Sequence, residues 1–396
     1  MPVASLLSRA AVVFTAASLP LALAFQPGAD YGQYKTTNLY NCTGHIPTSN
    51  VTVRNAADTL PQIDPSSGNG WERWDLFLHG TYPIVMRWSQ GDPSVPSSVP
   101  SLGKFEMLIL DINNETVHAS VADKLTYKND ENFKQIAVGN NTLTWDASAE
   151  WFNVSTSAGG YSITLDSFSS MLDTFHPNVE FYNGLLDSAG GPGWYGSVPV
   201  PRGHVTGYIQ TPNSTETALD GLSSLKHMFS RRPLPEYINK YSAATAWGYS
   251  KTFYDTHIFY QTEETNGTVH DAAYLGRALP VPGQSGVFST ASAIYAITDD
   301  TALYQLSVNP SNQTINAALP GCPNTNNISY VFNMSTATLL GSFTDLGGGK
   351  TTYHAVNGTT TAPFDGSSVD GSLSGIFEEY QAPSKGGDDD DGDDDN

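Results

Sequence analysis

Residues 191–211 read "GPGWYGSVPVPRGHVTGYIQT", and the second half of this stretch has the pattern of a β-strand. Successive side chains of a strand point to opposite sides. Val205 and Ile209 therefore share an apolar face. His204 and Tyr208 share the opposite, polar face. A hairpin with a purely structural role needs neither the Trp-Tyr pair nor the Arg and His, so we expect this stretch to contribute to function as well as to the fold.

Segments with the same alternation recur along the chain, separated by clusters of Gly, Pro, Asn and Ser. They predict an all-β protein, and their spacing is typical of sandwiches and closed barrels. The segments are 104–112, 161–168, 204–211, 251–262, 291–299 and 328–334.

The length of 396 residues, with 39% hydrophobic and 11% aromatic content, predicts two domains with sizeable cores. We place the break in 224–242, where two prolines interrupt any regular element. The predicted fold is two lipocalin-like β-barrel or sandwich domains packed together. The expected parts are an N-terminal β-domain (25–232), a C-terminal β-barrel domain (233–380) and a disordered acidic tail (381–396).

The N-terminus reads as a signal peptide over 1–24, with Arg9 followed by an apolar run that is too short to span a membrane. We expect a protein of the secretory pathway or the extracellular space, with no membrane anchor after cleavage. Eleven Asn-X-Ser/Thr sites indicate a glycoprotein. They are Asn41, Asn50, Asn114, Asn140, Asn153, Asn213, Asn266, Asn312, Asn327, Asn333 and Asn357.

The two cysteines, Cys42 and Cys322, are expected to form a disulfide in that compartment. The formal net charge is −21, and removing the seven aspartates of the terminal "DDDDGDDDN" leaves −14. Such a chain lacks the clustered Lys and Arg that nucleic acids require. We expect no metal site, because the tail lacks the pattern of a calcium loop and most histidines are scattered without metal-ligand spacing.

Polar and aromatic side chains occupy both faces of two predicted strands, 204–209 and 251–261. In the second strand, Tyr254 shares a face with Tyr260, while His257 lies on the opposite face. A strand that is buried on one face only carries its polar side chains on the opposite face, which meets water. Tyr and His on both faces therefore predict a barrel interior lined for a ligand.

Four segments together resemble a known superfamily: "VPVPRGHVTGYI" (198–209), Gly221, "KHMF" (226–229) and "AWGYSKTFYDTHIFYQ" (246–261). The resemblance is to the two-domain lipocalin-like superfamily of hydroxyneurosporene synthase-type hydratases, kievitone hydratase and fungal Diels–Alderases. In its pattern, His227 matches a histidine and Trp247 matches the Trp of the second domain. Lys226 stands where the pattern has an Asp, and Phe229 stands where it has a Trp.

The Lys226 substitution bears on the reaction, because a hydratase needs an acid to protonate the alkene and a base to activate water. The resemblance then implies a cofactor-independent pericyclase that cyclises an unsaturated polyketide or related apolar metabolite. Such an enzyme needs a pocket that folds the substrate and one donor to its carbonyl. The candidate catalytic residues are His204, Lys226 and His227. The candidate substrate-binding residues are Trp194, Tyr195, Arg202, Tyr208, Trp247 and Tyr254.

Three alternatives stay open. A hydro-lyase of the kievitone hydratase kind would add water to a prenyl or isoprenoid double bond. A carrier of apolar metabolites would have the same aromatic lining without turnover. A sugar-active protein is also compatible with the composition, since glycosidases draw their carboxylates from distant parts of the sequence.

Overall fold

The computed structural model describes most of the β-structure of the chain. The predicted signal peptide, Cys42, Cys322 and the tail beyond residue 383 lie outside the described residues. The described ranges are 51–53, 71–91, 102–111, 115–146, 150–169, 173–175, 195–213, 216–230, 233–250, 254–278, 292–298, 305–309, 314–319, 330–345, 348–364 and 367–383.

The first half of the chain forms a twelve-stranded antiparallel sheet, of which ten strands close into a barrel. Closure comes from β11, which pairs with β12 on one side and with β9 on the other. The strands are β1 (Val51–Val53), β2 (Trp71–Gly80), β3 (Ile84–Gln90), β4 (Leu102–Leu110), β5 (Thr116–Asn129), β6 (Phe133–Val138), β7 (Asn141–Asp146), β8 (Trp151–Ala158), β9 (Tyr161–Ser169), β10 (Asp173–Phe175), β11 (Tyr195–Gln210) and β12 (Glu216–Ser230).

The interior of this barrel is packed largely with apolar side chains, together with the buried polar side chains of Glu72, Gln90 and His227. Trp74, Trp88 and Trp145 lie in it with almost no exposed surface, among aliphatic residues from all sides of the ring. The expectation of a ligand-lined interior is therefore wrong for this barrel. The alternation along β11 is as expected, since Val205 and Ile209 are buried. Its polar face, however, points to solvent instead of to a ligand.

The second half forms a nine-stranded antiparallel sheet. Its edge strands, β16 and β17, are not paired with each other in the part of the chain that the structure describes, so the expected second barrel is seen there as an open sheet. The strands are β13 (Ile238–Tyr249), β14 (Tyr254–Glu264), β15 (Val269–Ala278), β16 (Ser292–Thr298), β17 (Gln305–Asn309), β18 (Thr314–Leu319), β19 (Tyr330–Thr344), β20 (Lys350–Phe364) and β21 (Ser367–Gln381).

All six segments with predicted strand alternation coincide with strands, and the all-β prediction is confirmed. The described residues contain no α-helix, only a short 3-10 helix at Leu234–Glu236 between β12 and β13. None of them forms a helix with the length and apolarity that crossing a bilayer takes.

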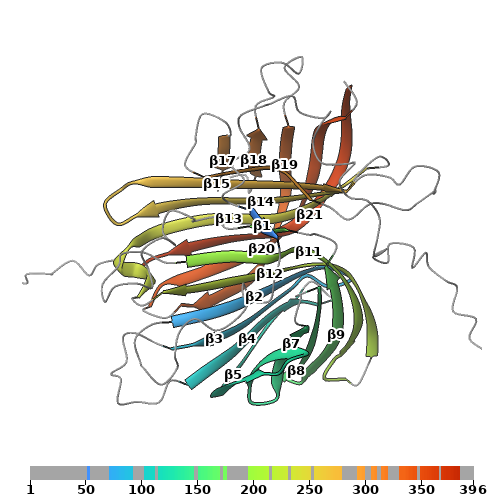
Figure 1. The fold of residues 1–396 in the computed structure, drawn as a ribbon, viewed down its shortest axis with the longest axis vertical. Helices are drawn as coiled ribbons and strands as arrows, with labels where there is room; N and C mark the ends of the chain where they lie inside the picture. The colour runs from blue at the N-terminus through green and yellow to red at the C-terminus, as the bar shows by residue number, and fades with distance from the viewer. Residues whose placement is uncertain are drawn as a thin grey trace, which may run out of the picture.

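The two sheets pack against each other through β2, β4, β5 and β11 on one side and β14, β19 and β21 on the other. Lys226 on β12 adds an ion pair to Glu378 on β21. In Figure 1 the barrel, blue to green, fills the lower half, and the second sheet, yellow to red, lies above it. Two apolar clusters cross the boundary. In one, Trp71 and Met228 meet Tyr241. In the other, Phe77 meets Tyr353. Burial of these side chains holds the two sheets together.

Barrel closure depends on a glycine where β11 passes between β9 and β12. A Cβ built on Gly207 would lie only 2.6 Å from Leu165 Cα and closer still to the Thr164 carbonyl. We therefore expect Gly207→Ala to push β9 away and to reduce the free energy of unfolding by ~1–3 kcal/mol, as overpacking does. Urea unfolding measures this change. Thr206→Ala, on the exposed face of the same strand, is the control, and equal stability of the two variants would contradict the packing argument.

Candidate active site

Charged side chains form a ladder of alternating sign on the face of the barrel that meets the second sheet. Lys226 on β12 lies opposite Asp75 on β2. Asp75 lies opposite Arg87 on β3, which in turn lies opposite Glu106 on β4. All four side chains are buried. Facing charges of opposite sign stabilise neighbouring strands, and burial makes each charge depend on its partner.

The second sheet completes the pairing. Asp345, just after β19, accepts hydrogen bonds from Arg73 and, at 2.7 Å, from Arg87 Nη1. Lys226 forms an ion pair with Glu378 on β21. We call these groups the interface charge cluster. It contains three cations and three carboxylates, and its members are Arg73, Asp75, Arg87, Lys226, Asp345 and Glu378.

Tyrosine hydroxyls and rings surround the cluster. Tyr241 accepts a hydrogen bond from Arg73 Nη2 at 2.7 Å, and Tyr353 accepts one from Arg87. The Lys226 ammonium lies 5.1 Å from the Phe77 ring and 5.8 Å from the rings of Tyr241 and Tyr260. Aromatic faces attract a cation, so these rings partly replace the water that the ammonium has lost.

The protonation of the cluster follows from burial and charge. Burial opposes ionisation of Asp75, but Arg87, Arg73 and Lys226 outweigh it, so the pKa of Asp75 lies well below its usual value. Burial lowers the pKa of Lys226, against the opposing effects of Glu378 and Asp75. Of the three cations in the cluster, Lys226 is thus the one whose pKa the site lowers.

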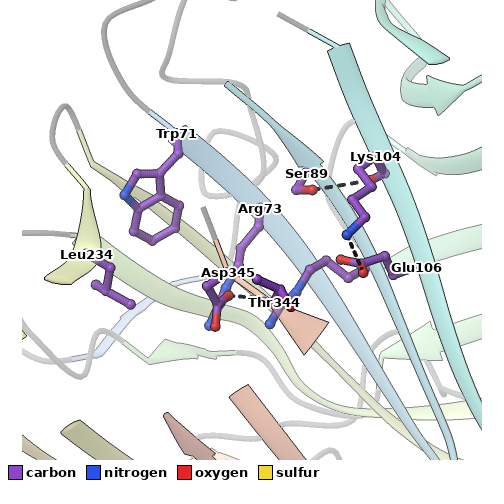
Figure 2. A pocket seen from close by; sticks show the side chains of 9 residues that line it. Trp71, Arg73, Ser89, Lys104, Glu106, Leu234, Thr344 and Asp345 are labelled. Carbon is purple, nitrogen blue, oxygen red and sulfur yellow. Dashed lines mark hydrogen bonds and ion pairs between the residues drawn. The ribbon is translucent and has the colours of Figure 1, made fainter. Parts of the chain in front are cut away.

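A cavity of about 50 Å³ lies beside the cluster, between the two sheets. Figure 2 shows Trp71 and Leu234 on one side of it, Ser89, Lys104 and Glu106 on the other, and Arg73 with Asp345 between them. The Lys104 side chain, paired with Glu106 at 2.6 Å, is 38% exposed, so the cavity reaches the surface there. Arg87 and Thr344 complete the lining.

This lining joins an apolar wall to donors and acceptors. The guanidinium groups of Arg73 and Arg87 are fixed donors for a carbonyl oxygen. Asp345 and Glu106 are acceptors at the same cavity. In the described part of the chain, no group of three His, Cys, Asp or Glu side chains is arranged to hold a metal ion. The guanidinium donors and the carboxylate acceptors of the cavity provide groups for charge stabilisation and proton transfer.

The two adjacent residues predicted to act together, Lys226 and His227, lie on opposite faces of β12. Lys226 belongs to the interface charge cluster. His227 points into the barrel, where its Nε2 lies 2.6 Å from Glu72 Oε1 and its ring stacks on Trp74 at 5.0 Å. Strand alternation is the reason, and it places His227 away from the cavity.

Three of the predicted binding residues come together between β11 and the second sheet. The Arg202 guanidinium lies 4.7 Å from the Tyr254 ring, and Trp247 donates a hydrogen bond of 3.3 Å to the Pro201 carbonyl. Burial lowers the pKa of Arg202 to about 10. This group lies at the boundary of the two sheets but does not line the cavity.

His204 and Tyr208 do not take part in an interdomain site. Tyr208 is 56% exposed, and His204 lies on the barrel surface with its Nε2 3.2 Å from Asp220. Their face of β11 points to solvent because the opposite face is needed for the barrel core. Tyr195 begins β11, but its side chain, like Trp194, lies outside the described residues. So do Asn41, Asn50, Asn114, Asn312 and Asn327.

The sequence analysis missed Arg73, Asp75, Arg87, Asp345 and Glu378. The stretch "WERWDLF" (71–77) carries a usable signal, because charges alternate with large apolar residues on both faces of one strand. A strand of that kind is buried on both sides, and its charges need buried partners. The identity of those partners depends on how the sheets pack, and the sequence pattern does not contain it.

Comparisons with known proteins identify the fold. No family model and no curated protein matches the chain. Two crystal structures of CghA, one of them with Sch210972, have TM-scores of 0.53 and 0.51 at 11% identity. Each covers 84% of this chain, and the matches span 99% and 98% of the CghA chains. Kievitone hydratase from Nectria haematococca has a TM-score of 0.45 at 10% identity, over 85% of this chain and 98% of its own. The CghA matches confirm the expected two-part β fold.

Asp75 provides a test of the cluster through its pH dependence. Its lowered pKa means that it stabilises the folded state above pH ~4, the usual range for an unfolded Asp, and that this stabilisation is lost as the pH falls further. We expect Asp75→Asn to reduce the free energy of unfolding by ~3–5 kcal/mol at pH 7. Below pH ~4, the difference in this free energy between the variant and the unmodified protein should become smaller. Denaturant titrations at several pH values measure it.

The control is Asp370→Asn, an exposed carboxylate that accepts a hydrogen bond of 2.7 Å from Thr361. Its effect should stay within ~0.5 kcal/mol. A gap between Asp75→Asn and the unmodified protein that is the same at pH 7 and pH 3 would contradict the assigned charge state.

Proposed function

We propose that the protein is an enzyme that binds an unsaturated, carbonyl-bearing small molecule at the cavity between the sheets and accelerates its intramolecular cycloaddition. The observation that carries this proposal is the cavity's composition. Trp71 and Leu234 form an apolar wall directly beside the guanidinium groups of Arg73 and Arg87. The sequence resemblance to fungal Diels–Alderases supports the choice of reaction, and CghA, which shares the fold, has a crystal structure with the small molecule Sch210972.

The arrangement fits what a cycloaddition requires of a protein. The barrier falls when the flexible substrate is held in its reactive shape and when a donor stabilises the negative charge that develops on the carbonyl oxygen. Arg73 is held by Asp345 and Tyr241, so its donors are fixed before the substrate arrives. Little reorganisation is then needed in the transition state.

The size of the cavity indicates which part of the substrate it holds. A volume of about 50 Å³ accommodates a carbonyl group with its neighbouring atoms. Lys104 lies on the exposed rim, so the rest of a larger substrate would extend outward past it. An apolar metabolite with one polar end fits this division.

A hydro-lyase is the second candidate, and one observation favours it. Lys226 stands where the superfamily pattern has an Asp, so β12 lacks that carboxylate. Asp75 and Glu378, however, lie beside Lys226 in space. Asp345 and Glu106 also line the cavity. Carboxylates for the base role in alkene hydration are therefore present among neighbouring strands, and the Lys226 ammonium beside them is a proton donor for the acid role.

The test incubates the purified full-length protein with a synthetic linear polyene that carries a conjugated ketone. We expect faster loss of polyene absorbance and a product diastereomer ratio that differs from that of the uncatalysed reaction. Leu234→Trp fills the cavity and should lower the rate ~10²-fold or more, since misplacing a substrate by about 1 Å has that effect. Leu339→Trp, at a 53% exposed position, is the matched control.

Thermal unfolding of both variants is the control that checks whether their fold is intact. An unchanged rate and product ratio with the unmodified protein would contradict the cycloaddition. Incorporation of oxygen from ¹⁸O-labelled water would establish hydration instead. Binding without any product would identify a carrier.

A further inference from the structure

The outer surface of the barrel wall formed by β8, β9 and β11 exposes aromatic rings that the proposed catalysis does not use. Phe168 on β9 is 51% exposed, and Tyr208 on β11 is 56% exposed. Trp151 on β8 lies opposite Phe168, and His204 on β11 lies opposite it on the other side. Neighbouring strands are about 4.8 Å apart. Trp151, Phe168 and His204 therefore form one continuous row, which we call the aromatic row.

A sequon lies directly beside this row. Trp151, Asn153 and Ser155 alternate along β8, so all three side chains lie on the same outer face. Asn153 is opposite Asp166, two residues from Phe168 on β9. Side chains at such diagonal positions are about 7–8 Å apart or less, which is within the reach of one sugar ring.

The Asn153 side chain reaches across to the neighbouring strand, β9. Its Nδ2 donates hydrogen bonds of 3.1 Å to the Leu165 carbonyl and 3.0 Å to Asp166 Oδ1. The amide nitrogen that N-glycosylation modifies is thus held over β9, the strand that carries Phe168. A sugar attached there begins its path beside the aromatic row.

We propose that Asn153 carries an N-linked glycan whose first sugar packs on the Phe168 ring against Trp151. In the modification, the amide nitrogen forms a bond to the anomeric carbon of a glycosyl diphosphate donor. The bond from that carbon to the diphosphate breaks, and the amide gives up one proton. The remaining N–H keeps one of the two hydrogen bonds.

The chemistry of the surroundings suits a sugar. One face of a pyranose ring presents C–H groups, which pack on an aromatic face, while its hydroxyls need polar partners. Asp166 and Thr206 lie in the next row of the sheet and supply them. The covalent attachment keeps the sugar at a high local concentration beside the aromatic row, so the sugar contacts the ring even if this contact is weak. This proposal depends on the expected secretory route and is independent of the proposed catalysis.

The experiment uses the full chain secreted from a eukaryotic host that adds N-glycans, and the same chain made without glycans in bacteria. Glycopeptide mass spectrometry measures occupancy at Asn153. Thermal unfolding is then compared among the unmodified chain, Ser155→Ala, Phe168→Ser and the double variant. Phe168→Leu is the second variant in case Phe168→Ser folds poorly. Thr268→Ala removes the sequon of Asn266, on the exposed turn after β14, and is the matched control.

We expect Asn153 to be occupied. Ser155→Ala should lower the midpoint of the glycosylated protein by about 2 °C or more, and should have little effect on the bacterial protein. In the Phe168 variants, Ser155→Ala should no longer lower the midpoint of the glycosylated protein. The effect of Thr268→Ala on the midpoint should be the same with and without the Phe168 ring.

An unoccupied Asn153 would overturn the proposal, whether or not Asn266 is occupied. So would an effect of Ser155→Ala that persists in the Phe168 variants. If instead sedimentation shows a dimer that Phe168→Ser dissociates with or without glycans, a second copy of the chain covers the aromatic row and the proposal is wrong.

Discussion

Asp345 joins the two halves of the molecule. It follows β19 in the second sheet, yet its carboxylate accepts hydrogen bonds from Arg73 and Arg87, which stand on two neighbouring strands of the barrel. Thr351 donates to the same carboxylate from β20. All of these groups are buried. A buried charge without its partner is costly, so this contact fixes how the sheets dock as well as holding them together.

The cavity and its donors depend on that docking. The apolar clusters around Trp71 and Phe77 exclude water on both sides of the charges, and this strengthens every electrostatic interaction between them. Arg73 and Arg87 remain charged and oriented beside the cavity, which reaches the surface at Lys104. The same contacts that stabilise the interface thus prepare fixed donors at a small, partly apolar site.

Strand alternation alone predicted a large part of this fold. It identified β4, β9, β11, β14, β16 and β19 and the correct buried face of β11, because one face of each strand must reach a core. The site was harder to predict. Lys226 was singled out, but His227 was grouped with it, although adjacent residues of a strand face opposite ways. Asp345 and Glu378 lie far from Arg73 and Lys226 in sequence, and only the packing of two sheets brings them together.

The central claim is that the charges of the two sheets act as one unit, and a double-mutant cycle tests it most directly. Arg73→Met, Asp345→Asn and the double variant are unfolded with urea at pH 7. The account predicts that the double variant loses less stability than the sum of the single variants, by ~1–3 kcal/mol, because each single change leaves a buried charge without its partner. Single effects that add within ~0.5 kcal/mol would show that the two residues are not coupled and would contradict the account.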